Sequence, residues 1–451
     1  MINTQKRFYK IVLMTLLFSV FTVNLTAESI DKKAIITKID TEIDGTTKQK
    51  YLLGEIDLFE GKEFADYDSL VEYLNESTQD LINKRIFEIA EYEITETGSD
   101  NQFENYSVKI IIKDANNTFF VPLAGYGSSN GFKIALKSNF NNIAGTLMNF
   151  NISSSLNINK NEALNRWDIP TWKITPSLSG LKIWGLIFDL SLTQKFATEK
   201  TYIFSSDDIQ QQYTYHSTSL NLATSIKLPY HLSYSFGPSL RFNYGINEIV
   251  NINPSDTIEQ EFSNLSFSHR FGYSKVDWID NLRNGFYANI SNKLTASYDL
   301  DRTPSFSTSI SSNVAFFYRI NHILNLSGRF KGSWSNQEID ITNNLRGVKS
   351  GYMNGYLGTA LSLDMTISVI NWNGVLEIQA RPFFDIGIVD IRDEAFDLEN
   401  DFAYTTGLDG ILYLDKWKSF VIRGTFGIDL SHYDWNELDK YEIEMTAGLS
   451  Y

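Results

Sequence analysis

The chain has 451 residues, no cysteine and a formal net charge of −15, from 39 Lys and Arg against 54 Asp and Glu. This acidic balance argues against a nucleic-acid-binding protein, which needs clustered basic residues to neutralise phosphate. The lack of cysteine excludes disulfide scaffolds, thiolate zinc sites and cysteine nucleophiles. Aromatic residues make up 14% of the chain and hydrophobic residues 43%, a composition that suits apolar residues alternating with polar ones.

The N-terminus has the pattern of a targeting segment. Lys6, Arg7 and Lys10 precede an apolar run over residues 11–23, and the small residues Thr26 and Ala27 follow. This arrangement is typical of a secretory signal peptide, and the run is short for a membrane-spanning helix. We expect residues 1–27 to be a signal peptide. The alternative is a retained N-terminal anchor.

Residues 31–115 predict a small α+β domain. An amphipathic helix is indicated where apolar residues recur at spacings of three, four and seven between Tyr67 and Ile82, with Asp66 as its N-cap. A generic domain of this class is the alternative without an assigned role. The predicted order is a strand at 34–43, a short helix capped by Thr46, the helix at 66–82, and strands at 86–95 and 106–113.

From residue 118 to residue 451, apolar residues recur with a period of two. In residues 361–369, for example, apolar residues alternate with Ser, Asp and Thr. Runs of this length with one apolar and one polar face are typical of transmembrane β-strands. We therefore predict an outer-membrane β-barrel of about 16 antiparallel strands. The sixteen predicted runs are 118–126, 130–139, 143–157, 171–180, 184–198, 211–228, 231–246, 260–276, 284–298, 304–320, 323–335, 356–369, 373–390, 402–415, 418–431 and 441–451.

The connections between these runs alternate between short and long, as in bacterial barrels with short periplasmic turns and longer outer loops. An even number of strands puts both ends of the barrel domain on one side, so we expect the N-terminal domain to lie in the periplasm. Six tryptophans near strand ends suit contact with outer-membrane lipid: Trp172, Trp184, Trp278, Trp334, Trp372 and Trp417.

Three short motifs give the chain a specific resemblance. Leu345-Arg346-Gly347-Val348 lies in the longest predicted loop, Phe383-Phe384-Asp385-Ile386-Gly387 lies in the thirteenth run, and Tyr451 ends the chain with an aromatic residue. With a small domain before a barrel, this pattern resembles the BamA/TamA superfamily of outer-membrane assembly and translocation proteins. The resemblance implies that residues 31–115 are one POTRA-like periplasmic domain. It also implies that Asp364 stands where the family usually has Glu.

The resemblance implies a lock between this loop and two strands. Alternation puts Leu361, Leu363 and Met365 toward lipid, so Asp364 faces the interior, and Asp385 does so from the next strand. A loop folded into the interior could bring Arg346 against both carboxylates, since a buried guanidinium needs such partners. Gly347 and Gly387 complete the two motifs. Val348 replaces the usual aromatic residue, which we expect to loosen the packing. The alternative is that these are ordinary interior charges.

Other chemistry has little support in the sequence. Gly127-Ser128-Ser129-Asn130-Gly131 matches a hydrolase pattern, but it joins two predicted strands and reads as a hairpin turn. The five histidines have no ligand spacing, so we expect no metal site. We predict a protein that is not an enzyme, has no cofactor and binds no nucleic acid.

The predicted function is insertion or folding of client outer-membrane proteins. The first strand, with Pro122 and Gly125, would form a weak seam with the last strand, and a client strand could pair there by β-augmentation. The edge of the POTRA-like sheet could hand clients over in the same way. Partners would be unfolded clients and periplasmic accessory proteins. One alternative is a pore dedicated to a single exported substrate, and another is a surface antigen or adhesin.

Overall fold

The computed structural model describes thirteen segments of the chain. The predicted signal peptide at residues 1–27 and the terminal Tyr451 lie outside them. The described residues are 32–100, 102–127, 131–158, 160–161, 166–167, 170–202, 209–251, 262–299, 304–348, 353–372, 374–390, 401–431 and 441–449.

The chain divides into two compact units. One contains the described residues up to Ile39, together with Phe59–Leu74 and Ile94–Val108. The other contains Asp40–Leu58, Asn75–Glu93 and the described residues from Lys109 onward. The second unit therefore joins part of the N-terminal region to the whole of the long strand-rich region.

The N-terminal region contains a four-stranded sheet in the order β2-β1-β4-β3. The sequence missed the two-residue strand β2, which is too short to show a period. Thr46 does not cap α2, whose N-cap is Lys48, but Asp66 accepts a 2.7 Å hydrogen bond from the Ser69 amide at the start of α3. The elements are β1 (Lys33–Asp44), α2 (Gln49–Glu55), β2 (Glu63–Phe64), α3 (Tyr67–Asn83), β3 (Phe87–Ser99) and β4 (Phe103–Asp114).

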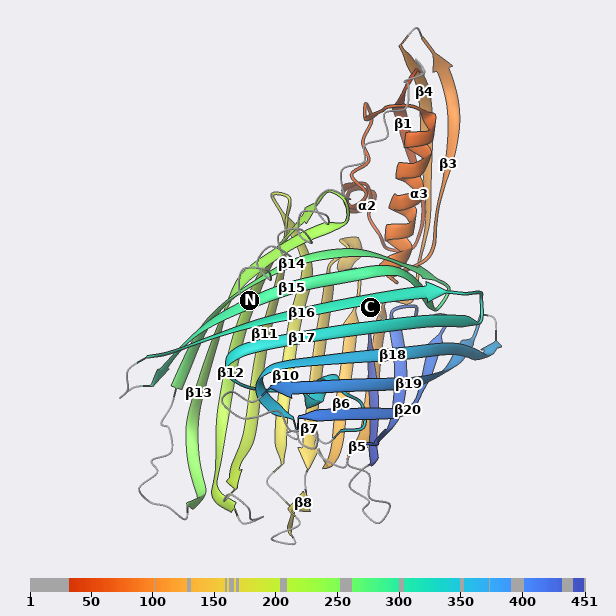
Figure 1. Cartoon of the computed structure of the whole chain (residues 1–451). Coiled ribbons are helices and arrows are strands. Elements are labelled where there is room, and N and C mark those ends of the chain that lie inside the picture. The colour runs from red at the N-terminus through yellow and green to blue at the C-terminus, as the bar shows by residue number, and fades with distance from the viewer. Residues whose placement is uncertain are drawn as a thin grey trace, which may run out of the picture. The chain divides into compact units, whose positions relative to one another are not determined.

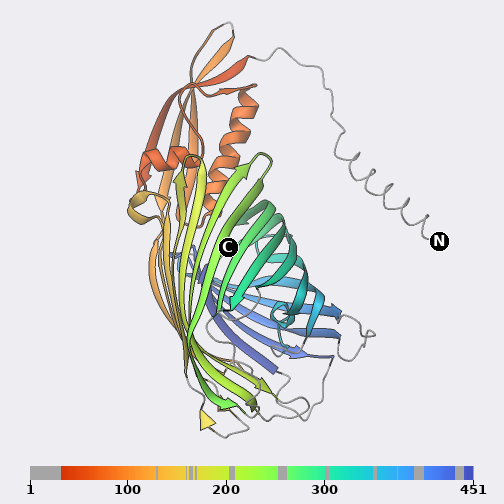
Figure 2. The same ribbon diagram turned by 90° about the vertical axis from the view of Figure 1, so that its left-hand side faces the viewer.

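Most of the other described residues form one sheet of sixteen strands, in which neighbouring strands pair in antiparallel fashion (Figure 1). Figure 2 shows the long strands of this sheet curving around as one wall. The strands are β5 (Thr118–Gly127), β6 (Gly131–Phe140), β7 (Asn149–Ile158), β10 (Thr171–Ile183), β11 (Leu186–Tyr202), β12 (Ile209–Leu228), β13 (Leu232–Asn251), β14 (Phe262–Ile279), β15 (Leu282–Asp299), β16 (Ser305–Arg319), β17 (Leu324–Asp340), β18 (Asn354–Trp372), β19 (Leu376–Asp390), β20 (Phe402–Leu414), β21 (Phe420–Asp429) and β22 (Tyr441–Leu449).

Two short helical turns and a small hairpin complete the elements. The hairpin pairs β8 (Lys160–Asn161) with β9 (Arg166–Trp167), and the turn η2 covers Thr342–Asn344. The turn η1 covers Ile143–Gly145, where the sequence predicted the start of a strand. Asn142 and Ala144 have positive φ angles of 55° and 50° there, and this left-handed backbone cannot continue a strand. Among the described residues, no helix is both long and apolar enough to cross a membrane.

The alternation predicted from sequence is present in the central strands. On β18, the apolar side chains of Leu361, Leu363 and Met365 are exposed on one face, whereas Asp364 is buried on the other. On β19, Phe384 is exposed and Asp385 is fully buried. We call the face that carries these aspartates the inner face. The outer face is apolar and solvent-accessible, as expected for a surface that meets lipid.

The two end strands of the sheet, β5 and β22, lie side by side, with Cα atoms within 8 Å of each other. Among the described residues, however, the order of hydrogen-bonded strands runs from β22 to β5 without joining these two. The predicted closed barrel is thus open along this line. We call the line between β5 and β22 the seam. Its foot is the end at which β5 begins, at Thr118, and β22 ends, at Leu449.

At the foot of the seam, the sheet overlaps itself. Phe119 lies on the inner face of β5, because its neighbour Phe120 is 61% exposed on the outer face. Phe420 shares the outer face of β21 with the exposed Phe426, six residues along an uninterrupted ladder with β22. The rings of Phe119 and Phe420 nevertheless contact each other, with centroids 5.1 Å apart. The inner face of the first strand therefore covers the outer face of β21 at this point.

Candidate functional site

The candidate site is formed by the loop between β17 and β18, which we call loop 341–353. Its two ends are joined by a 3.0 Å hydrogen bond from the Ile341 amide to the Met353 carbonyl. The Met353 amide donates in turn to the Thr342 hydroxyl at 3.2 Å. Lys331, on the inner face of β17, donates to the Asn344 side chain at 2.9 Å. These contacts turn the described part of the loop, residues 341–348 and 353, back onto the inner face of the sheet.

Arg346 of this loop forms a bidentate pair with Asp385 of β19. Its Nε donates to Oδ2 at 2.8 Å and its Nη2 to Oδ1 at 2.5 Å. The Arg346 backbone amide also donates to Oδ2 of Asp385, at 3.0 Å. Two parallel charge-assisted hydrogen bonds fix the plane of the guanidinium as well as its position. The loop is thus attached to β19 by both its backbone and its side chain.

The remaining nitrogen of Arg346 contacts two further carboxylates. Nη1 lies 2.7 Å from Oδ1 of Asp364 on β18 and 3.2 Å from Oδ2 of Asp409 on β20. The face of the guanidinium stacks on the ring of Phe383, 3.7 Å from its centroid. Three carboxylates from three adjacent strands and one aromatic ring therefore surround a single arginine, which is the coordination that a desolvated guanidinium needs.

Asp409 connects Arg346 to two other arginines of the sheet. Its carboxylate accepts from Arg381 Nε at 2.9 Å and lies 2.8 Å from Arg423 Nη2. The Thr425 hydroxyl donates to its other oxygen at 2.7 Å. The cluster thus has three carboxylates, Asp364, Asp385 and Asp409, and three guanidinium groups, Arg346, Arg381 and Arg423. We call these six residues the inner charge cluster.

The two motif glycines let the backbone of the loop approach the sheet. Gly347 has a φ of +89°, and a Cβ atom there would lie 2.7 Å from the Ile428 amide nitrogen and 2.8 Å from the Gly427 carbonyl carbon. On β19, a Cβ atom at Gly387 would lie 2.5 Å from the Leu345 side chain. At position 347 the backbone has a positive φ and there is no room for a Cβ atom, because the loop touches β21 directly. Only glycine meets both requirements.

The packing around Val348 differs from the sequence expectation. Val348 is buried in a cluster with Ile341, Leu345, Met353, Ala360, Val389 and Ala403. The expected looser packing is therefore not found, because small and branched side chains from loop and sheet fill this region. The aromatic contact to Arg346 comes instead from Phe383 of β19.

The structure places the predicted residues Arg346, Gly347, Asp364, Asp385 and Gly387 around one point, while Tyr451 lies outside the described residues. Sequence reasoning missed Asp409, Arg381 and Arg423. Alternation on β20 could have identified Asp409, because it shares a face with the buried Thr405 and Ile411. The inner charge cluster holds loop 341–353 against the inner face of the sheet. Each of its charged side chains forms at least one ion pair within the cluster, which suits mechanical attachment.

Known proteins share this fold at low sequence identity. No family model and no curated protein match the chain. BamA from Haemophilus ducreyi lacking POTRA domains 1–3 matches over 92% of this chain and 84% of that chain, with 13% identity and a TM-score of 0.53. CdiB from Acinetobacter baumannii matches over 92% and 74%, with 12% identity and a TM-score of 0.59.

CdiB from Escherichia coli also matches, over 94% of this chain and 92% of that chain, with 11% identity and a TM-score of 0.50. Likeness at these identities concerns the arrangement of the chain in space. It confirms, at the level of the fold, the resemblance that the Arg-Gly and Asp-x-Gly motifs indicated. The chain therefore has the fold of the BamA and CdiB β-barrels.

Proposed function

We propose that this protein assists the insertion and folding of client proteins at the outer membrane. The observation that carries the proposal is the seam, where the first and last strands lie side by side without a joining ladder among the described residues. An unpaired strand edge can accept an incoming strand through backbone hydrogen bonds. A client strand would add to β5 or β22 and use its own folding free energy to complete insertion.

The outer face of the sheet supports a location in the outer membrane. Large apolar side chains are exposed on many neighbouring strands, among them Leu222, Phe271, Ile290, Leu294, Phe316, Phe330, Leu363 and Phe384. A continuous apolar surface of this kind needs lipid or protein to cover it. We propose that residues 31–115 act as a POTRA-like periplasmic domain and that residues 1–27 direct export. Client proteins and periplasmic accessory proteins would be the partners.

A second proposal is translocation of one dedicated substrate through the interior. The chain shares its fold with CdiB as well as with BamA, and this likeness supports translocation as a second candidate function. This function would require loop 341–353 to leave the inner charge cluster, in which Arg346 contacts three carboxylates. Insertion at the seam requires no such displacement, and we therefore place it first.

The test is reconstitution of the purified protein in liposomes. The folding of an unrelated outer-membrane barrel is timed by its protease resistance, with this protein and with a closed porin of similar size as control. The proposal expects faster folding with this protein only. Equal rates with the porin would overturn it and direct the search to a single exported substrate.

A second arm tests the seam itself. Because the chain contains no cysteine, an introduced pair forms a single defined disulfide. Cysteine pairs placed along β5 and β22 should abolish the acceleration when oxidised and restore it when reduced. The matched control is Leu220→Cys with Leu240→Cys, directly paired positions on β12 and β13. Oxidation of this pair should leave the activity intact.

A further inference from the structure

The turn between β20 and β21, which we call turn 415–419, receives hydrogen bonds from three separate segments. The Lys418 carbonyl accepts from Arg85 Nε at 2.7 Å. The Lys416 carbonyl accepts from the Asn116 amide at 3.2 Å. The Ser419 hydroxyl accepts from Asn141 Nδ2 at 3.0 Å. All of these residues belong to the same compact unit.

The guanidinium of Arg85 has three hydrogen-bond acceptors and one aromatic neighbour. Besides Lys418, its guanidinium donates to the Asp280 carbonyl and to the Asn281 side chain, each at 2.7 Å. Its Cζ atom lies 4.5 Å from the centroid of the Trp278 ring. Arg85 is buried and has a φ of 59°, an uncommon backbone conformation for a residue other than glycine. Arg85 therefore connects the end of the α3 region to two turns of the sheet, one between β14 and β15 and the other between β20 and β21.

The other two donors come from the opposite side of the seam. Asn116 lies two residues before β5, and Asn141 directly follows β6, whose last residue Phe140 pairs with Thr118. Turn 415–419 leads instead into β21, whose first residue Phe420 pairs with Leu449 at the end of β22. Hydrogen bonds from Asn116 and Asn141 to this turn therefore cross the foot of the seam.

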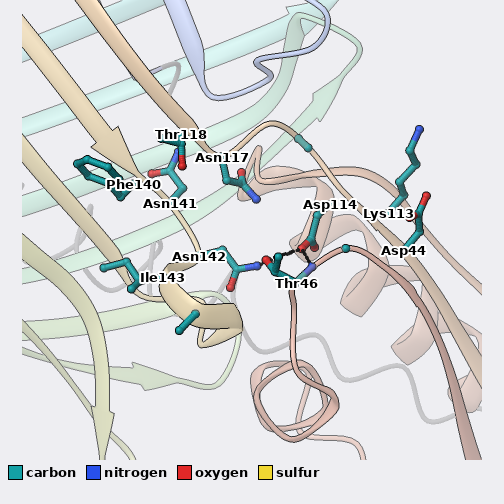
Figure 3. A pocket seen from close by; sticks show the side chains of 13 residues that line it. Asp44, Thr46, Lys113, Asp114, Asn117, Thr118, Phe140, Asn141, Asn142 and Ile143 are labelled. Carbon is teal, nitrogen blue, oxygen red and sulfur yellow. Dashed lines mark hydrogen bonds between the residues drawn. The ribbon is translucent and has the colours of Figure 1, made fainter.

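Apolar packing adds to the same crossing. Phe119 and Phe420 are both buried, and Val121, Leu123, Leu414, Trp417 and Ile422 pack around them. Nearby, the close-up in Figure 3 shows Asp114 and Thr46 facing Asn142 of the turn that follows β6. The side-chain Nδ2 of Asn142 donates to the Thr47 hydroxyl, and that hydroxyl donates to Asp114 at 2.6 Å. The β6 side of the foot is thus also tied to the end of β4.

We propose that Arg85 is a positioning residue that holds turn 415–419 across the foot of the seam and so keeps this end of the seam closed. Three observations carry the proposal: the buried hydrogen bonds of Arg85, the two hydrogen bonds that cross from Asn116 and Asn141, and the contact between Phe119 and Phe420. We call these contacts the foot latch. While it holds, strands β5 and β22 separate first at the end away from the foot.

The foot latch also gives the N-terminal region control over the seam. Arg85 follows α3, so a movement that withdraws Arg85 removes the hydrogen bond to the Lys418 carbonyl and two hydrogen bonds to the turn between β14 and β15. The crossing contacts of Asn116, Asn141 and Phe119 then hold the foot alone. This role of Arg85 rests on the proposed insertion at the seam, but the latch itself can be measured independently.

The test is disulfide formation across the foot in the full chain. Asn141→Cys with Ser419→Cys replaces one crossing hydrogen bond by a reporter pair. Adding Arg85→Met should slow oxidation of this pair about tenfold, the loss expected for one hydrogen bond from a charged donor. The Leu220→Cys and Leu240→Cys pair on β12 and β13 should oxidise at an unchanged rate in the same background. An equal slowing at both pairs, or at neither, would overturn the proposal.

Arg319→Met is the matched control variant. Arg319 contacts Asp280 at 3.2 Å, on the same turn that Arg85 contacts. Among the described residues, it forms no hydrogen bond or ion pair with turn 415–419. The proposal expects Arg319→Met to leave oxidation of the 141–419 pair unchanged. If it slows the pair as much as Arg85→Met does, the effect belongs to the turn at Asp280 and the latch assignment is wrong.

A second measurement avoids the reporter cysteines. The Asn116 amide, which donates to Lys416, should exchange its hydrogen slowly in the unmodified chain and about tenfold faster in Arg85→Met. Unchanged exchange would contradict the latch. Reconstitution separates this result from the proposed function. If Arg85→Met changes the latch measurements but the protein does not accelerate client folding, the insertion proposal is wrong and the latch stands. If the protein accelerates folding but Arg85→Met changes neither latch measurement, the latch is wrong and the insertion proposal stands.

Discussion

Arg346 is the residue on which the inner charge cluster depends, because among the described residues it is the one that contacts all three of Asp364, Asp385 and Asp409. Arg346→Ala should lower the free energy of unfolding by about 3–5 kcal/mol, since it leaves buried carboxylates without their partner. The measurement is the urea midpoint of the reconstituted chain. Adding Asp364→Ala and Asp385→Ala should restore much of the loss. Arg270→Ala, at an exposed arginine of β14, should change little.

Asp409 is expected to matter more than Asp364. Asp409 contacts three guanidinium groups, whereas the ion pair of Asp364 is with Arg346. Asp409→Asn removes the charge that keeps Arg346, Arg381 and Arg423 together, so like charges then repel one another. Its thermal midpoint should fall further than that of Asp364→Asn in parallel melts. Equal shifts would show that Asp409 does not organise the cluster.

The contact of the loop with β21 predicts a sharp difference between two glycines. Gly347 and Gly185 have similar positive φ angles, but a Cβ atom would meet the β21 backbone only at Gly347 and would find open space at Gly185. Gly185→Ala should therefore cost only the strain of its backbone, about 1–2 kcal/mol. Gly347→Ala should cost several times more and expose Arg346 to solvent, as protease cleavage within loop 341–353 would report.

At the scale of elements, α2 is fixed by the carboxylate at its end. Glu55 lies 3.1 Å from Lys84 and 3.0 Å from Lys227 and also contacts Lys182 of β10. Burial alone would raise the pKa of Glu55, but the three ammonium groups outweigh it and lower the pKa to about 2. These residues share one compact unit with the sheet, so the carboxylate links α2 to β10 and β12.

This shift sets a pH window. A pKa below the unfolded value of 4.5 means that Glu55 stabilises the fold fully above pH 4.5 and that the contribution is lost as the pH falls toward about 2. Glu55→Gln should lower the urea midpoint at pH 7 and flatten its dependence between pH 5 and about 3. Glu63→Gln, which breaks the exposed pair with Lys33, should leave that dependence as it is.

The sequence predicted elements whose physics is local. Alternation on β18 and β19 was enough to direct Asp364 and Asp385 inward, because each strand repeats with period two. The turn at Ile143–Gly145 was not predicted, because its left-handed residues Asn142 and Ala144 are stabilised by contacts with residues far away, such as Thr47. The contacts of Asp409 with Arg381 and Arg423 depend on the register of β20 with its neighbours β19 and β21. The alternation within one strand does not determine this register.

At the scale of the whole molecule, the seam predicts uneven protection of the sheet. The ladder between β12 and β13 is paired over most of its length, whereas no ladder joins β5 to β22 among the described residues. Amides of β5 and β22 that face the seam should therefore exchange hydrogen faster than those of β12. Mass spectrometry of peptides from the reconstituted chain would measure this. Equal protection in β5 and β12 would mean that backbone hydrogen bonds join β5 to β22 along the seam.

The overlap at the foot has a consequence for the size of the sheet. In a barrel whose edges pair, the perimeter can grow only by breaking a row of backbone hydrogen bonds. Here the inner face of β5 covers the outer face of β21, and the contact between Phe119 and Phe420 is apolar. Apolar contacts have no fixed direction, so the two layers can slide past each other once the hydrogen bonds of Asn116 and Asn141 to turn 415–419 are broken. The perimeter could then increase by the width of a guest strand through sliding, with every strand pair of the wall intact.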